Sequence, residues 1–327
     1  MSTKISYSKG IFDAYDYLLK NHKDFFVIGQ GLWSPWYVGS TMKDLDKKYG
    51  KERVIDCPVS ELATTGASVG AAINGMRPMI VHPRIDFMLL AVDQIVTQAA
   101  KWRHMFGGNS SCPVTFRGII NRGGEQGAQH SQSLHSWFAH IPGLRVVMPS
   151  SPNDVRDLMI SSVLCDDPVL FIDDRWLYEV EEKKKPIDFT PLNEIKPKVI
   201  SKGTDITLVG IGHTTNLLKN TQNELLSQNV SCEIIDLRVL NPIDSKVIID
   251  SVEKTKRLLV VDGDWSSCGL SSEIISIVAE SINPKKLLNC PARITFPDAP
   301  APTSKVLESE FYISKSQIID KVLSLVK

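Results

Sequence analysis

Short apolar runs alternate with longer periodic segments through the first half of the chain. Six apolar runs predict buried strands, at residues 24–29, 53–58, 79–82, 114–120, 144–149 and 169–174. Residues 60–75 and 87–106 lie between these runs and predict helices. Because strands that alternate with helices form parallel sheets covered on both faces, this half predicts a doubly wound α/β domain.

The apolar pattern stops and then restarts in the second half. Residues 179–203 are charged, contain prolines and have no apolar period, which is typical of a linker. New strands are predicted at 206–212, 232–240 and 257–264, with helices near 215–228, 244–253 and 270–282. We therefore predict a first domain at residues 1–185, a linker at 186–200 and a second, smaller α/β domain at 201–327.

Composition narrows the possible partners. The 37 basic and 37 acidic residues cancel, so no charge excess indicates binding to nucleic acid or to a membrane surface. The six cysteines form no C-x-x-C pair and favour buried thiols over a disulfide framework or a zinc site. The N-terminus lacks the apolar core of a signal peptide, and no stretch is long enough to cross a bilayer, so we expect a cytoplasmic protein.

Unusual side chains follow the predicted strands of the first domain. In open α/β sheets, ligands bind at the carboxyl ends of the strands, so these loops are the candidate site. The residues that we single out there are Gln30, Trp33, Glu61, His82, Arg84, Phe87, His130 and His135.

Most of these residues also have a structural interpretation. Glu61 is compatible with a first-turn acid on a helix that Ser60 caps, and Arg84 with a surface partner of Asp86. The tryptophans are compatible with a core or an interface. His130, His135 and His140 are spaced by five, which points them in different directions on either a helix or a strand. That spacing disfavours a metal site built from this segment, so we predict no metal ligands.

An ordered set of motifs carries a family resemblance. The stretches "VIDCPVSELATTGASVGAAINGMRP", "FMLLAVDQIVTQAAKW", "RGGEQGAQHSQSLHSWFAHIPGLRVVMPSSPNDV" and "DDPVLFIDDRWLY" resemble the beta subunit of thiamine diphosphate-dependent 2-oxo acid dehydrogenases. The second half continues the resemblance in "VGIGHTTNLL", "IDLRVLNPID", "VVDGDWSSCGLSSEI" and "PDAPAPTSKVLE". More distantly, both domains resemble the C-terminal two-thirds of transketolase.

The resemblance implies roles for individual residues. Glu61 matches the family glutamate of the D-x-P-x-x-E pattern, whose carboxyl group binds the cofactor's pyrimidine and favours its imino tautomer. Phe87 matches an aromatic position against that ring. His130 matches the A-Q-H-S-Q histidine, which reaches the cofactor's reactive carbon. His135 stands where the family commonly has no histidine, and either extends the site or caps the following segment.

The resemblance also implies a partner. A chain that binds the whole cofactor carries the family's G-D-G motif followed by an asparagine, which holds the magnesium diphosphate. Residues 262–264 read "DGD", a different sequence in the other domain. The family pattern then assigns Mg²⁺ and the diphosphate mainly to an alpha subunit, in an assembly of two alpha and two beta chains.

Two loops depart from the pyruvate and branched-chain pattern. Gln30, Gly31 and Trp33 replace an acidic stretch, and His82 and Arg84 replace an apolar one. An arginine at this position suits a carboxylate or phosphate, which suggests altered recognition of the substrate. Decarboxylation of a 2-oxo acid with acyl transfer to a lipoyl acyltransferase remains the leading hypothesis. The alternatives are the C-terminal subunit of a split transketolase-like enzyme and a non-catalytic assembly subunit.

Overall fold

The computed structural model describes residues 4–327, which form two compact units. The first unit contains the described residues up to Asn121 together with Phe138–Ile195, and the second contains Arg122–Trp137 and Lys196–Lys327. Both units are α/β, which confirms the fold class. The contacts assign residues 122–137 to the second unit, whereas the sequence analysis placed them in the first domain. Hydrogen bonds of Arg122, Glu125 and His135 run to the second half of the chain.

The first unit is built on a parallel sheet with the strand order β6-β7-β5-β4-β2-β3. Its strands are β2 (Phe25–Gly29), β3 (Val54–Asp56), β4 (Arg77–His82), β5 (Thr115–Ile120), β6 (Arg145–Val147) and β7 (Val169–Asp174). Each lies within, or overlaps, a run predicted from the sequence. A separate antiparallel pair joins β1 (Lys4–Ser6) to β8 (Glu181–Lys183).

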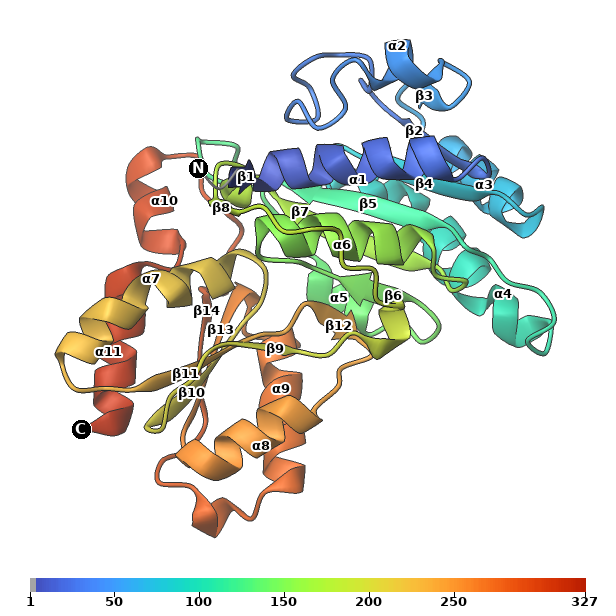
Figure 1. Ribbon diagram of the computed structural model, residues 1–327. Helices are drawn as coiled ribbons and strands as arrows, with labels where there is room; N and C mark the ends of the chain where they lie inside the picture. Colours follow the sequence, from blue (N-terminus) through green and yellow to red (C-terminus); the bar gives the residue numbers. More distant parts are fainter. Residues whose placement is uncertain (1–3) are drawn as a thin grey trace. The chain divides into compact units, whose positions relative to one another are not determined.

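Helices cover this sheet. Helices α1 and α6 contact each other and lie side by side in Figure 1, whereas α3 packs on β4 and on the segment that follows it. Ser6 and Ser151 cap α1 and α6 by accepting hydrogen bonds from the third residue of each helix. The helices are α1 (Tyr7–Asn21), α2 (Leu45–Tyr49), α3 (Glu61–Ile73), α4 (Ala100–Met105) and α6 (Pro152–Val163), with short 3₁₀ turns η3 (Arg175–Leu177) and η4 (Leu192–Glu194).

The predicted helix at 87–106 differs from the one observed. It starts as a 3₁₀ turn, η1 (Phe87–Ala91), continues as a π-helix, η2 (Asp93–Ala99), and becomes α-helical only in α4. Such irregular turns frequently occur at functional sites. Apolar periodicity does not distinguish these helix types, because all three bury one face.

The second unit has a five-stranded sheet with the order β14-β13-β10-β11-β9. Its strands are β9 (Lys198–Ser201), β10 (Ile206–Gly210), β11 (Cys232–Asp236), β13 (Leu258–Trp265) and β14 (Ala292–Phe296). β9 pairs antiparallel with β11, and the other pairs are parallel. The predicted strand at 232–240 breaks after Asp236, because Arg238 adopts a left-handed turn conformation before β12 (Val239–Asn241).

Helices flank the second sheet in two pairs that contact each other, α7 with α11 and α8 with α9 (Figure 1). Their bounds are α7 (His213–Ser227), α8 (Lys246–Thr255), α9 (Leu270–Ser281) and α11 (Lys315–Val326), with α10 (Lys305–Phe311) and the turn η5 (Pro284–Lys286). An apolar core fills the space between the sheet and α7 and α11. The cysteines of the described residues are free, and Cys268 and Cys290 are exposed, which corrects the expectation that the thiols are buried.

Candidate active site

Three neighbouring strands of the first unit end at the same edge of the sheet. The register pairs Gly29 of β2 with Asp56 of β3 and with Val81 of β4. The loops that follow these strands therefore start at the same edge of the sheet, which is the edge where open α/β sheets bind their ligands. Gln30, Glu61 and Arg84 come from these three connections.

Glu61 is the first residue of α3 and its side chain is buried. Gln30 donates a hydrogen bond from Nε2 to Glu61 Oε1 at 3.0 Å. Ser60 makes no side-chain cap, so the interpretation of a simple capped helix start does not describe this residue. The carboxyl group is instead held by an amide and kept away from bulk water at the helix N-terminus, where the macrodipole favours negative charge.

His82 is the last residue of β4 and is fully buried. Its Nε2 lies 3.4 Å from the hydroxyl of Thr65, which is one turn after Glu61 on α3. Burial lowers the pKa of His82 to about 3, so the imidazole is neutral at physiological pH. His82 therefore joins β4 to α3 and offers no positive charge to a ligand.

Phe87 opens η1 with 40% of its surface exposed. Since η1 contacts α3, the ring belongs to the element that packs beside the helix of Glu61. An aromatic side chain that is partly exposed beside this helix is of the kind that can stack on a flat ligand.

Arg84 lies near a second arginine that the sequence analysis missed, Arg175, which directly follows β7. Arg175 donates from Nη2 to the carbonyl oxygen of Tyr37 at 2.6 Å. Burial lowers the pKa of Arg84, the charge of Arg175 lowers it further, and Asp86 and Tyr37 oppose these effects. Within residues 4–327, Arg84 Nη1 and Arg175 Nε are buried and have no hydrogen-bond acceptor.

Trp33 has contacts that stabilise the loop after β2. Its indole nitrogen donates to the carbonyl oxygen of Val54 at 2.8 Å, and Lys51 lies 3.9 Å above its ring. These contacts fix the loop after β2, and 41% of the side chain remains exposed.

The two candidate histidines of the segment 122–137 lie in the second unit. His130 is half-buried in a turn. Its backbone N–H donates a hydrogen bond to the carbonyl oxygen of Gly127 at 3.3 Å. His135 is fully buried at the start of α5 (His135–Ala139) and has partners inside the unit. Its contacts are with Ser133, Asp262 and Asp264 of the same unit.

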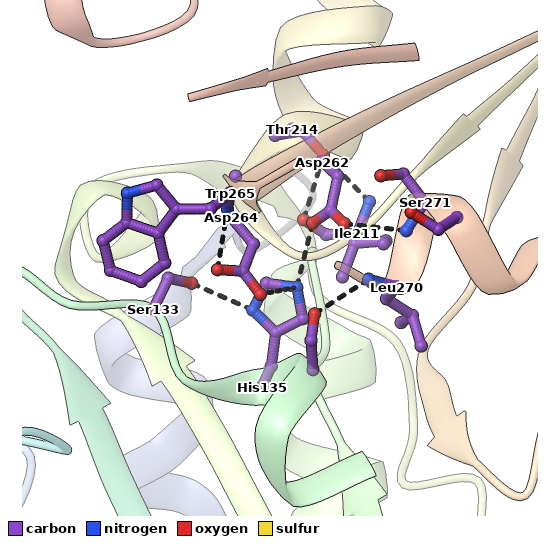
Figure 2. A network of polar contacts seen from close by, with 12 residues as sticks. Ser133, His135, Ile211, Thr214, Asp262, Asp264, Trp265, Leu270 and Ser271 are labelled. Carbon is purple, nitrogen blue, oxygen red and sulfur yellow. Dashed lines mark hydrogen bonds and ion pairs between the residues drawn. The ribbon is translucent and has the colours of Figure 1, made fainter. Parts of the chain in front are cut away.

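Figure 2 shows the imidazole of His135 between a serine and two aspartates. Its Nδ1 lies 2.9 Å from Ser133 Oγ, and its Nε2 lies 2.9 Å from Asp262 Oδ1 and 3.8 Å from Asp264 Oδ2. Asp262 also accepts a hydrogen bond at 3.0 Å from the N–H of Ser271 in the first turn of α9. The network joins the loop before α5 to β13 and α9.

The network sets the charge of its members. Burial alone would lower the pKa of His135, but Asp262 and Asp264 outweigh it and raise that pKa above its ordinary value. Burial raises the pKa of Asp264, against the attraction of His135 and with the repulsion of Asp262. The two aspartates therefore favour the protonated form of His135 against the effect of burial.

Some buried charges escaped the sequence analysis. Arg117 on β5 pairs with Asp173 on β7 at 2.8 Å with both side chains inaccessible, and Asp262 and Asp264 stand on one face of β13. The one feature of the sequence that pointed to these charges was an acidic residue inside a predicted buried strand, because such a residue is rarely buried without a partner. Among the described residues no group of His, Cys, Asp or Glu is arranged to hold a metal ion, and no helix is long and apolar enough to span a membrane.

Comparisons with known proteins agree with this architecture. Residues 3–180 match the transketolase pyrimidine binding domain, and residues 196–318 match the transketolase C-terminal domain. A split-gene transketolase, described as an inactive beta4 tetramer, superposes with a TM-score of 0.79 over 99% of both chains at 16% identity. That similarity shows the fold.

Curated relatives share more of the sequence. The beta subunit of acetoin:2,6-dichlorophenolindophenol oxidoreductase from Bacillus subtilis is 35% identical over 86% of this chain and 82% of its own. The beta subunit of the pyruvate dehydrogenase E1 component from Rickettsia felis is 35% identical over 91% and 90%, and the mitochondrial one from Bos taurus is 32% identical over 99% and 90%. The chain therefore belongs to the family of beta subunits of thiamine diphosphate-dependent 2-oxo acid dehydrogenases, built from the transketolase pyrimidine-binding and C-terminal domains.

Proposed function

We propose that the first unit binds the pyrimidine of thiamine diphosphate between Glu61 and Phe87. Through this contact the unit activates the cofactor for attack on a 2-oxo acid. The observation that carries this proposal is the buried Glu61 carboxyl group, which Gln30 holds at the start of α3. A ring nitrogen offered to Glu61 Oε2 fits this environment, because Gln30 occupies the other oxygen. When bound, thiamine diphosphate supplies a nucleophilic carbon for attack on the 2-oxo group.

The chain's own residues divide the remaining tasks. Phe87 stacks on the pyrimidine and fixes its orientation. His82, neutral and buried, holds β4 against α3 and thereby supports Glu61. His130, which matches the family's A-Q-H-S-Q histidine, exchanges a proton with the reacting substrate.

Arg84 and Arg175 support the binding of an anionic group. The charge of Arg175 lowers the pKa of Arg84, and a carboxylate or phosphate would be attracted to both guanidinium groups. Each arginine also has a buried nitrogen without an acceptor among residues 4–327. The carboxylate of a 2-oxo acid has the required charge. Trp33 and Tyr37 fix the loop on which this contact depends.

The diphosphate and Mg²⁺ belong to a partner in this proposal. The sequence has no G-D-G motif, so an alpha subunit supplies these contacts in an assembly of two alpha and two beta chains in the cytoplasm. A lipoyl acyltransferase is the proposed acceptor of the acyl group.

Replacement Glu61→Gln tests the proposal. A neutral amide cannot share a proton with the pyrimidine, so exchange of the cofactor's C2 hydrogen in the alpha–beta complex should slow by roughly a hundredfold. The measurement is proton–deuterium exchange by NMR, with the isolated chain as the arm expected to bind cofactor weakly. An exchange rate equal to that of the native complex would refute the role of Glu61. Turnover of a ketose phosphate but no 2-oxo acid would favour the split transketolase alternative.

A further inference from the structure

The segment 122–137, which carries His130, is attached to the second unit near both of its ends. At its beginning, Arg122 donates from Nη1 to the carbonyl oxygen of Gly263 at 3.1 Å. Glu125 has a left-handed backbone, and its N–H donates to Glu308 Oε1 at 3.0 Å. Its first turns are therefore held by β13 and α10.

The His135 network forms the other attachment. His135 reaches Asp262 on β13, and Ser136 Oγ accepts a hydrogen bond from the N–H of Leu270 at 2.9 Å, at the start of α9 (Figure 2). Between the two attachments lies the turn with His130, five residues before His135. The two attachments thus hold the backbone on both sides of His130.

The second attachment is polar and fully buried. The charged groups that face His135 are Asp262 and Asp264 from β13 and Arg122 from the beginning of the same segment. Ser133 occupies the remaining ring nitrogen. Loss of the ring at position 135 would leave Asp262 Oδ1 buried without this hydrogen-bond partner, and an unsatisfied buried acid is costly enough to loosen the segment.

We propose that His135 is a positioning residue, which holds the segment 122–137 on β13 through Asp262 and so sets the position of His130 in the reaction. The inference rests on the proposed function, in which His130 exchanges a proton with the substrate. It assigns His135 no contact with substrate or cofactor. This role differs from the substrate contact considered in the sequence analysis.

The test uses His135→Gln in the complex with the alpha subunit. With pyruvate as substrate, kcat should fall roughly ten- to a hundredfold while KM and the cofactor Kd stay near native values, because binding groups of the first unit are untouched. Hydrogen exchange followed by mass spectrometry should show faster exchange at amides 126–134. The double replacement His135→Gln/Asp262→Asn, a neutral amide pair, should recover much of both properties.

Lys254→Gln is the matched control. It breaks another ion pair of the second unit, to Glu233, and touches no residue of the segment, so kcat and exchange at 126–134 should remain native. Should His135→Gln fail to fold, Ser133→Ala removes only the Nδ1 contact and should show the same changes in smaller measure.

Two results would overturn the inference. Faster exchange with native kcat would show that catalysis does not need this attachment, and a lower kcat with native exchange would show that His135 acts in another way. Failure of the proposed function looks different. In that case the cofactor's C2 hydrogen would exchange at the native rate in the Glu61→Gln complex, whatever the His135 variants do.

Discussion

His82 in the first unit and His135 in the second are both fully buried, yet their neighbours differ. Among residues 4–327, His82 faces the hydroxyl of Thr65 and no carboxylate, and burial lowers its pKa to about 3. His135 faces Asp262 and Asp264, which raise its pKa despite burial. Burial alone therefore does not set the direction of a histidine's pKa shift, because a neighbouring acid can reverse it.

The same contrast extends to arginines. Arg117 is fully buried, and although burial opposes its charge, Asp173 raises its pKa well above the ordinary value. Arg84 makes no ion pair among the described residues, and its pKa is lowered by burial and by Arg175. The completely paired charges hold the fold together, whereas the incompletely paired ones lie at the edge of the sheet where we place the substrate.

The largest expected effect comes from removing the acid that distinguishes His135. Asp262→Ala removes the hydrogen-bond partner of His135 Nε2 and the acceptor of the Ser271 N–H. The free energy of unfolding should fall by about 3–5 kcal/mol. Guanidinium unfolding of the full chain measures it, with Asp250→Ala, which breaks an exposed pair with Lys246, as a control that changes little. A loss no greater than the control's would remove the basis of the comparison.

The second prediction separates the two histidines by pH. The folded-state pKa of His82 lies below the unfolded value of about 6.5, so its contribution is present above that pH and is lost as the pH falls, by about 2 kcal/mol at pH 5. The pKa of His135 is raised, so its contribution is present below about pH 6.5 and is lost as the pH rises through the folded-state value.

Stability curves of the two glutamine variants show whether this is so. His82→Gln should flatten the acid side of the curve, and His135→Gln should flatten the alkaline side. Unfolding midpoints between pH 5 and 9 are the measurement. Curves that stay parallel to the native one on both sides would contradict the assigned charge states.

The smallest expected effect concerns the incompletely paired arginines. Arg84→Met roughly keeps the length of the side chain and removes a positive charge that Arg175 repels. The free energy of unfolding should therefore change by less than about 0.5 kcal/mol. The kcat/KM for an anionic 2-oxo acid should fall about tenfold, equivalent to roughly 1.4 kcal/mol. Steady-state kinetics of the alpha–beta complex decide the matter. A native kcat/KM together with a weakened complex would identify Arg84 as an interface residue.

Much of the fold follows from local patterns. The parallel strands and α3 were predicted because buried strands and amphipathic helices have periods that a few neighbouring residues define. The turns η1 and η2, the break at Arg238 and the assignment of 122–137 to the second unit were not predicted. These features depend on contacts between residues far apart in the chain, which a local pattern does not record.

For the site, the sequence by itself determined which side chains follow the strands, and hence that Glu61, Arg84 and Phe87 belong to one edge of a sheet. Only the tertiary structure decided their states. His135 and Asp262 are separated by 127 positions in the chain. Arg84 follows one strand, and Arg175, whose charge lowers the pKa of Arg84, follows another. The charge of a buried group depends on the water it loses and the partners it gains, and both are defined only when the chain is folded.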